Sequence, residues 1–459
     1  MRHTVFLSVV TVSCFLVPAN AQITLPASAA AASNAPKGDV PRRLTLETAE
    51  DILIHNNLTL TAARYGVDIT RAQRLIASLR PNPTITLGTE QFDFGHPFLH
   101  VFSTDSNSAA NRVYTFRYDQ IFERGEKRRL RTEVADSQLR AAEAQVLDAT
   151  RQQLFQLKQA FYTAVLAREN LRVADENLYL INSTEQLIKL HVETGDVAEG
   201  ELIKFQSNKV QYQRDLVSSQ LVYQQAARDV LNILGAEPKN VIGVIPTGGP
   251  DQLPQLLADA PVDLIGDLRA EPVAASLIEL QQVAIDNRPD VMAAQHNLKA
   301  AEQALDLAYA LRHRDLDIGW EYQRNGGENT FGVVVSVPVF VHNNHQGEID
   351  QATAQVQQAR TQLMQVKLQT MTDVDKAYRA YDLAQKMLRV YSIGALQKAE
   401  EAFSIAGVAY REGATSLLEL REAQRTYNQT RVAYNQAHFD FRMSVHQLEL
   451  ATGKELMKP

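Results

Sequence analysis

The feature that most constrains this chain is a run of 69 residues, Glu126 to Thr194, that contains neither Gly nor Pro. As one continuous helix it would measure about 100 Å at roughly 1.5 Å per residue, far too long for a globular domain. Its apolar residues stand among many Ala, Gln and Arg residues, so its apolar stripe is narrow, as in a coiled coil. The run therefore predicts a long helix that buries its stripe against other long helices.

The second half of the chain repeats this arrangement. The first half contains a further uninterrupted run at 201–234, and the second half contains one at 414–452 and a run at 348–412 that is interrupted only by Gly394 and Gly407. Another long helix is expected to extend from Thr45 to about Arg80, where Pro81 and Pro83 follow. These runs predict a mostly helical chain built from a duplicated unit.

The spacing of glycines shows how close the repetition is. Gly195 and Gly235 are 40 residues apart, and so are Gly413 and Gly453. The segments "HVETGDVAEGELIKFQ" and "AYREGATSLLELREAQ" surround the first glycine of each pair and place a Glu six residues after it. Repetition at this length indicates two copies of one unit, neither able to bury its stripes alone.

The start of the chain has the features of a secretory signal. A basic residue and an apolar run precede Ala-Asn-Ala, which favours cleavage after Ala21, while lipid attachment at Cys14, the only cysteine, is the alternative. We predict a signal peptide (1–21), a flexible leader (22–43), a first repeat (44–235), a loop-rich connector (236–276), a second repeat (277–453) and a tail (454–459).

Each repeat also contains a pair of strand-like segments, at 84–92 and 112–122 and at 316–323 and 330–340. Their aromatic or aliphatic residues alternate with polar or small ones, a pattern typical of outer-membrane strands, although an ordinary half-buried sheet is the alternative. Because four strands cannot close a barrel, several subunits would pool their strands. The residues predicted to face lipid are Tyr114, Phe116, Tyr118, Trp320, Tyr322 and Phe331.

Composition and motifs argue against several functions. A net charge of −7 leaves no domain-sized basic surface for nucleic acid. No phosphate-binding loop, Ser nucleophile elbow or zinc-protease motif occurs, so we expect neither an enzyme nor a cofactor. His342, His345 and Glu348 could be metal ligands, but the intervening Asn-Asn favours a turn. His96 and His100 are expected in an exposed loop, and no metal site is predicted.

From Leu44 to about Thr452 the chain resembles the outer-membrane efflux protein family, whose best-known member is the trimeric TolC channel. The likeness rests on "LTLETAEDILIHNN", on the two Gly-centred hairpins, and on "YDQIFERGEKRRLR", which is similar to the corner between strand and helix in the heavy-metal efflux branch. It implies a homotrimer with a shared 12-stranded transmembrane β-barrel and a periplasmic tunnel of long helices.

The resemblance also implies a function and a set of partners. The chain would be the outer-membrane channel of a tripartite efflux system, a passive exit duct for metal cations or drugs. A periplasmic adaptor and an inner-membrane pump would deliver the substrate. Two alternatives remain: a periplasmic coiled-coil adaptor or scaffold without a pore, and a secreted coiled-coil adhesin or filament.

The family's gate residues are aspartates that correspond by position to Glu419 and Glu422, and the first repeat's acidic residue corresponds to Glu201. Threefold symmetry would turn each Glu into a ring of carboxylates that favours cations over anions in a narrow mouth. Crowded carboxylates would also raise one another's pKa. A solvated helix face is the alternative interpretation.

The adaptor-facing turns of the family correspond to Gly195, Tyr410, Arg411 and Gly413. Helix packing is the alternative role for Tyr410, which Val192 replaces in the first repeat. One departure concerns the gate: the best-known member has an Arg two residues after the second glycine, where this chain has Thr415. Arg411 or Arg421 could take the place of that Arg.

Overall fold

The computed structural model describes residues 40–90, 113–195, 197–236, 257, 260–325 and 328–456. The predicted signal peptide, Cys14, His96 and His100 lie outside these residues, as does most of the predicted leader and about half of the connector. The predictions made for these segments therefore stay predictions.

The described part of the first repeat contains four helices, α2 (Leu46–Asn56), α3 (Leu58–Ser78), α4 (Lys127–Glu193) and α5 (Glu199–Ile233). The uninterrupted runs thus form α4 and α5 as expected. The single helix expected from Thr45 to Arg80 is wrong, because the chain turns extended at Asn57, with φ −64° and ψ 124°. The Asn57 side chain accepts a hydrogen bond from the Leu60 amide at 2.9 Å and caps α3.

Outside residues 326–327, which are not described, the second repeat contains five helices, α7 (Leu277–Asn287), α8 (Pro289–Ala310), α9 (Gln346–Ser392), α10 (Ala395–Arg411) and α11 (Leu417–Thr452). The break between α7 and α8 lies at Arg288, the counterpart of Asn57. Of the two glycines in the long run, Gly394 ends α9 and adopts a left-handed φ of 95°, whereas Gly407 lies inside α10. No such break divides α4.

The strand segments of both repeats form one antiparallel sheet in the order β2 (Thr84–Glu90), β3 (Val113–Phe122), β5 (Leu316–Asn325) and β6 (Glu328–Ser336). The four strands occur where the alternation of the sequence placed them. The register pairs Tyr118 with Trp320 across β3 and β5, so the two repeats share a continuous ladder. The second sheet is a short parallel pair, β1 (Arg43–Leu44) and β4 (Asp263–Leu264).

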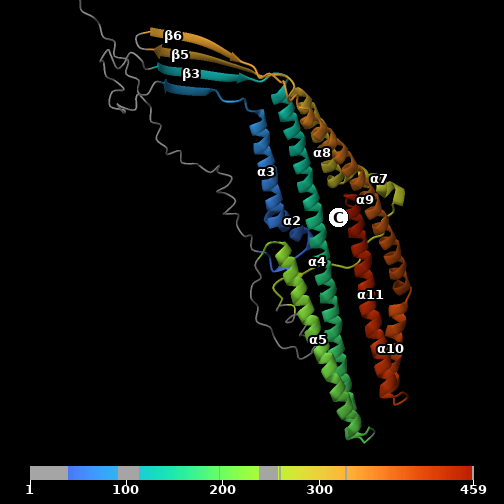
Figure 1. Cartoon of the computed structure of the whole chain (residues 1–459). Coiled ribbons are helices and arrows are strands. Elements are labelled where there is room, and N and C mark those ends of the chain that lie inside the picture. The colour runs from blue at the N-terminus through green and yellow to red at the C-terminus, as the bar shows by residue number, and fades with distance from the viewer. Residues whose placement is uncertain are drawn as a thin grey trace, which may run out of the picture. The chain divides into compact units, whose positions relative to one another are not determined.

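Helix α4 is the common packing partner of both repeats. It packs against α3 and α5 of its own repeat and against α8 and α11 of the other, while α9 packs against α8 and α11 (Figure 1). Leu157, Phe161 and Val165 of α4 lie in the largest buried apolar cluster. Among the residues that the structure describes, no helix is both long enough and apolar enough to cross a membrane.

A buried polar cluster also joins the repeats. Lys158 of α4 lies 3.5 Å from Glu50 of α2 and 3.6 Å from Glu449 of α11. His446 Nδ1 lies 2.8 Å from a Glu449 oxygen, and its ring stacks on Tyr162 at 5.2 Å. Despite burial, which acts to raise it, the pKa of Glu449 falls to about 2 because His446 and Lys158 stabilise the carboxylate. The cluster therefore holds α2, α4 and α11 at one level.

We predict that Asn57→Ala lowers the thermal unfolding midpoint of the purified full chain. The substitution removes the α3 cap and a 2.8 Å hydrogen bond from the side-chain amide to the Ile233 carbonyl. Loss of a cap together with a buried hydrogen bond costs about 2 kcal/mol. Asn287→Ala, which removes only an exposed bond within α7, should leave the midpoint nearly unchanged; equal midpoints for the two variants would contradict the role of Asn57.

Candidate functional site

The predicted gate and adaptor residues gather at the turns of two helical hairpins, α4–α5 and α10–α11 (Figure 1). Gly195 ends the first hairpin's leading helix with φ 83°, and Gly413 does so in the second with φ 70°. No atom lies within 4 Å of a Cβ built on either glycine, so each is needed for its left-handed backbone rather than for space. Both turns are exposed.

The two hairpins contact each other near their tips. The Tyr410 ring meets the His191 ring edge to face, with centroids 6.2 Å apart. Leu417 of α11 packs on a buried cluster of Ile188 and Phe205 from the first hairpin. The two repeated turns therefore form one composite tip.

Tyr410 is 9% exposed, in keeping with the packing role that the sequence left open. Burial raises the pKa of its hydroxyl, and the nearby negative charge of Glu201 adds to that rise. Glu201 of the first repeat thus lies in the electrostatic neighbourhood of the second repeat's turn. Arg411 is exposed next to Tyr410, and its Nε donates to the Gly407 carbonyl.

The three predicted gate carboxylates are exposed in the single chain. Glu419 lies in the first turn of α11, where its amide donates to the capping Ser416 hydroxyl at 3.3 Å. Its carboxylate accepts a hydrogen bond from Thr415. Glu422, one turn further along the same face, lies 2.7 Å from Arg425, which lowers its pKa.

These contacts identify partners of the predicted gate residues within the single chain. Thr415, the departure from the family pattern, binds Glu419 directly. Within the single chain Glu422 pairs with Arg425, and a gate role for Arg411 or Arg421 stays a prediction. Arg425 was missed, although its spacing of three residues from Glu422 on a helix was a usable signal.

Further from the turn, Glu185 of α4 links this helix to α5 by an ion pair. Its carboxylate lies 2.7 Å from Lys209 of α5 and 2.9 Å from Lys189 of its own helix, and Gln206 donates to it at 3.0 Å. These hydrogen bonds lower the pKa of Glu185 from its ordinary 4.5 to about 2. The first hairpin is therefore held together by a charge that persists well below neutral pH.

The sheet carries the second group of predicted residues. Its register aligns Leu87, Phe116, Tyr322 and Phe331 in one row across the four strands. Period-two alternation then places all six predicted lipid-facing residues on one face. Trp320 lies at its centre, with its ring 5.3 Å from Phe116, 6.0 Å from Tyr118 and 6.0 Å from Phe331. Phe331 is 68% exposed, so this apolar face is uncovered in the single chain.

The opposite face of the sheet is polar. Arg117 pairs with Asp119 at 2.8 Å and lies 3.9 Å from Glu321 on the neighbouring strand. A Cβ on Gly319 would collide with the Asp119 carboxylate, so the glycine makes room for this ion-pair group. The sheet therefore separates an aromatic face from a charged one.

His345, in the segment between β6 and α9, makes local contacts. His345 begins α9 in a left-handed conformation, and its ring contacts Phe340 at 5.1 Å and Glu348 at 3.2 Å. Within the described residues, no three His, Cys, Asp or Glu side chains are placed to hold a metal ion.

Comparison with known proteins agrees with this architecture. Residues 280–454 match the family model described as outer membrane efflux protein. The cobalt-zinc-cadmium resistance protein CzcC of Cupriavidus metallidurans is 22% identical over 396 residues, which cover 85% of this chain and 85% of that protein. The pyoverdine export outer membrane protein OpmQ of Pseudomonas putida is 24% identical over 384 residues, 81% of this chain and 73% of that protein.

Solved channel structures share the fold. The structure of CusC superimposes with a TM-score of 0.69 at 18% identity, covering 89% of this chain and 92% of that one. The open state of the Neisseria gonorrhoeae MtrE outer membrane channel gives 0.69 at 18% identity, covering 91% and 90%. The fold is thus that of the outer-membrane efflux channels. The family model matches most of the second repeat, in agreement with the resemblance drawn from the sequence.

We predict that Glu185→Gln weakens the α4–α5 hairpin in a pH-dependent manner. Because the folded pKa lies below the ordinary value, the carboxylate stabilises the fold fully above about pH 4.5 and loses this effect as the pH falls toward about 2. The thermal midpoints of wild type and variant should therefore differ at pH 7 and converge on acidification. A constant difference between pH 7 and pH 3 would contradict this origin.

Proposed function

We propose that this chain is the outer-membrane channel subunit of a tripartite efflux system, a passive exit duct for substrates delivered by an inner-membrane pump through a periplasmic adaptor. One observation carries the proposal: a four-stranded sheet with an exposed aromatic face continues into a helix of 67 residues. The aromatic face suits lipid, and the helices would extend into the periplasm.

The two edge strands of the four-stranded sheet support assembly as a homotrimer. β2 and β6 are its edge strands, and each has a free side along which another strand can pair. Closure with two further copies satisfies these edges and yields a barrel of about 12 strands, within the range of outer-membrane barrels. Its polar face, with Arg117 and Asp119, would line the interior.

The residues at the helical tip support the assignment of a gate and of an adaptor-docking surface there. Glu201, Glu419 and Glu422 would form carboxylate rings around the tunnel mouth in a trimer and favour the passage of cations. The exposed turns at Gly195 and Gly413, with Arg411, would contact the adaptor. Tyr410 is buried below the turns, and its contact with His191 would fix the distance between them.

The substrate class is proposed as metal cations or drugs. CzcC is named for cobalt, zinc and cadmium resistance and OpmQ for pyoverdine export. Neither name identifies the substrate of this chain. No ATP-hydrolysing motif occurs in the sequence, so the partner pump would supply both energy and selection. Susceptibility of a deletion strain to metals, dyes, detergents and antibiotics would identify the cargo.

The alternative is a periplasmic coiled-coil adaptor or scaffold without a pore. It would use the long helices but leaves the exposed row of Leu87, Tyr322 and Phe331 without a role. Fractionation separates the two: a channel extracts with outer membranes and conducts ions in planar bilayers, whereas a scaffold does neither.

We predict that Val333→Arg reduces recovery in the outer membrane, whereas Val334→Arg does not. Val333 is 66% exposed on the aromatic face, and Val334 lies on the polar face. Arg on a lipid-facing strand costs about 2–4 kcal/mol near the bilayer midplane, while interior positions tolerate charge. Equal recovery of both variants by outer-membrane fractionation would contradict the assignment of faces.

We predict that Glu419→Gln with Glu422→Gln lowers cation preference in planar bilayers. Removing both rings weakens the negative potential at the mouth, so the reversal potential in a salt gradient should shift toward zero and block by multivalent cations should weaken. The control pair is Glu400→Gln with Glu401→Gln on α10, which removes the same charge away from the turn. If selectivity is unchanged in the first pair, these residues are not part of the gate.

A further inference from the structure

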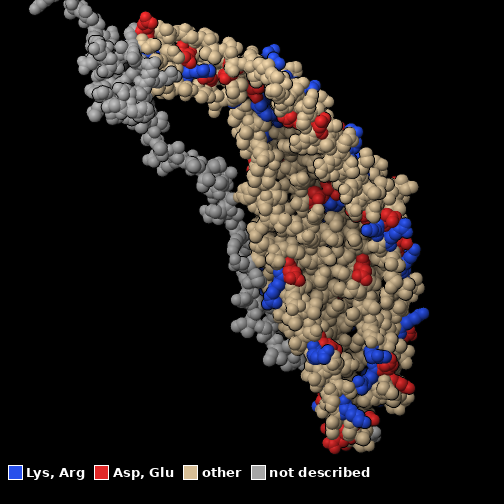
Figure 2. All heavy atoms as spheres, in the orientation of Figure 1, with Lys and Arg blue, Asp and Glu red and all other residues tan. Residues whose placement is uncertain are grey.

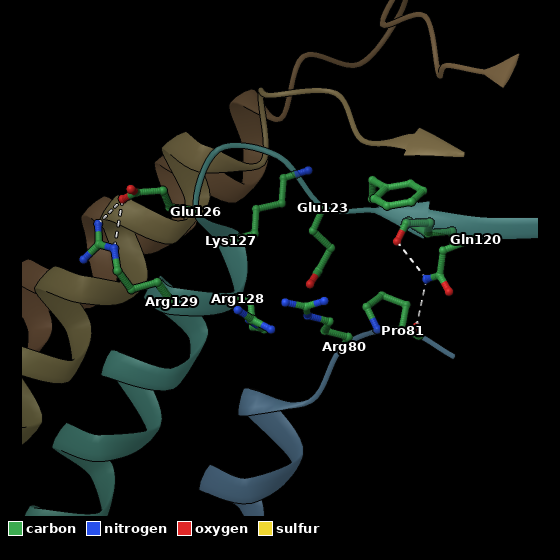
Figure 3. A pocket seen from close by; sticks show the side chains of 10 residues that line it. Arg80, Pro81, Gln120, Glu123, Glu126, Lys127, Arg128 and Arg129 are labelled. Carbon is green, nitrogen blue, oxygen red and sulfur yellow. Dashed lines mark hydrogen bonds and ion pairs between the residues drawn. The ribbon is translucent and has the colours of Figure 1, made fainter. Parts of the chain in front are cut away.

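A pocket of about 590 Å³ lies where β2 and β3 meet α3 and α4 (Figure 3). It is lined by Arg80 and Pro81 before β2, by the end of β3, and by the first turn of α4. Four basic and two acidic side chains line it, so the pocket is basic in a chain whose net charge is −7. Neither the gate nor the adaptor surface uses this place.

Most of the lining charges already have partners. Lys127 lies 2.9 Å from Asp315, which also accepts from the Arg124 amide, and Arg129 pairs with Glu126 and Glu133. Glu123 pairs with Arg131. These contacts fix the junction between β3 and α4, and they neutralise Glu123 and Glu126.

Two guanidinium groups are left over. Arg80 and Arg128 are exposed, and within the described residues neither guanidinium has an ion-pair or hydrogen-bond partner. Figure 3 shows their head groups reaching toward the same space from α4 and from the end of α3. Two guanidinium forks that face one space match the oxygens of a phosphate, which Arg binds bidentately.

An apolar surface adjoins these cations. Phe122 and Ile121 line the pocket and are 51% and 43% exposed. By alternation Phe122 belongs to the same face as Phe116 and Tyr118, so the aromatic face of the sheet runs up to the pocket. A ligand with a phosphate at one end and a hydrocarbon chain at the other would fit both surfaces.

We infer that this corner is a binding site for a phosphate-bearing lipid headgroup. The inference rests on the proposed function, which places the sheet in the membrane. β3 has 10 residues, or about 34 Å of extended strand, close to the thickness of a bilayer's hydrocarbon core. Arg80 and Arg128 then lie at the periplasmic boundary, where headgroup phosphates are found, with the acyl chain along Phe122.

The test is equilibrium binding of dioctanoyl phosphatidylglycerol to the purified full-length chain in an uncharged detergent. Arg80→Gln with Arg128→Gln should weaken binding about tenfold or more, since two charge-assisted contacts are lost. Arg214→Gln with Arg389→Gln changes the charge equally at exposed positions far along α5 and α9, and should bind like wild type. Equal binding by wild type and the Arg80/Arg128 variant would overturn the site.

Two further measurements separate the sources of the phosphate and protect against misfolding. Inorganic phosphate that displaces the lipid at equal concentration would indicate a free-phosphate site and overturn the lipid assignment; displacement only at far higher concentration supports it. Arg80→Lys with Arg128→Lys keeps the charge but loses the planar fork, so its affinity should fall between those of wild type and the Gln variant. An affinity no different from that of wild type would contradict bidentate recognition.

Bilayer conductance distinguishes failure of this site from failure of the proposed function. A wild-type chain that conducts but binds no phosphatidylglycerol loses only the lipid site, whereas one that never conducts loses the channel assignment as well. If the Arg80/Arg128 Gln variant dissociates into monomers while wild type ignores the lipid, the two arginines contact a neighbouring copy, and the lipid site is overturned.

Discussion

The architecture depends on the packing of one helix, α4, against both repeats. Its apolar stripe is too narrow to make a core of its own, so it needs α3 and α5 on one side and α8 and α11 on the other. Lys158 and Tyr162 of α4 also reach a buried charge cluster with His446 and Glu449. Because the single helix α4 packs against both repeats, it fixes the distance between the sheet at its start and the turn at its end.

That separation places two chemically different surfaces at opposite ends of the same helix. The sheet carries a row of aromatic side chains on one face, and acidic and basic side chains gather near the turns, with others on the sheet (Figure 2). In the view of Figure 2, charged residues are sparse over the centre of the helical face and more frequent along its right-hand edge. The distribution suits a chain that meets lipid at one end and water and proteins at the other.

Much of the fold could be predicted from local sequence, because long runs without Gly or Pro and strict alternation are local signals. The break at Asn57 could not, since it depends on a side chain that reaches the Ile233 carbonyl, 176 residues away. Likewise, Gly394 and Gly407 looked equivalent, yet only Gly394 adopts a positive φ. The pairing of β3 with β5 has no local signal, because alternation defines a strand's faces and not its neighbour.

The candidate site could likewise be predicted from the sequence only in part. The repeated glycine and the spacing of Glu419 and Glu422 were visible in the sequence, as was the sheet face that carries Trp320. The contact between His191 and Tyr410 was not, because it joins residues from two hairpins. Thr415 was noted only as a departure from a pattern, and its hydrogen bond to Glu419 became visible in three dimensions.

The break at Gly394 gives the two hairpins different mechanics. In the first repeat a single rod of 67 residues runs from the sheet to the turn, so force applied at its tip is carried as bending along about 100 Å of helix. In the second repeat α9 and α10 are two rods joined at a glycine with no neighbour within 4 Å of a Cβ position. The continuous helix α11 packs against both α9 and α10 and so spans this break. The first hairpin is thus continuous on its sheet side, whereas the second carries one break there and depends on α11 for continuity.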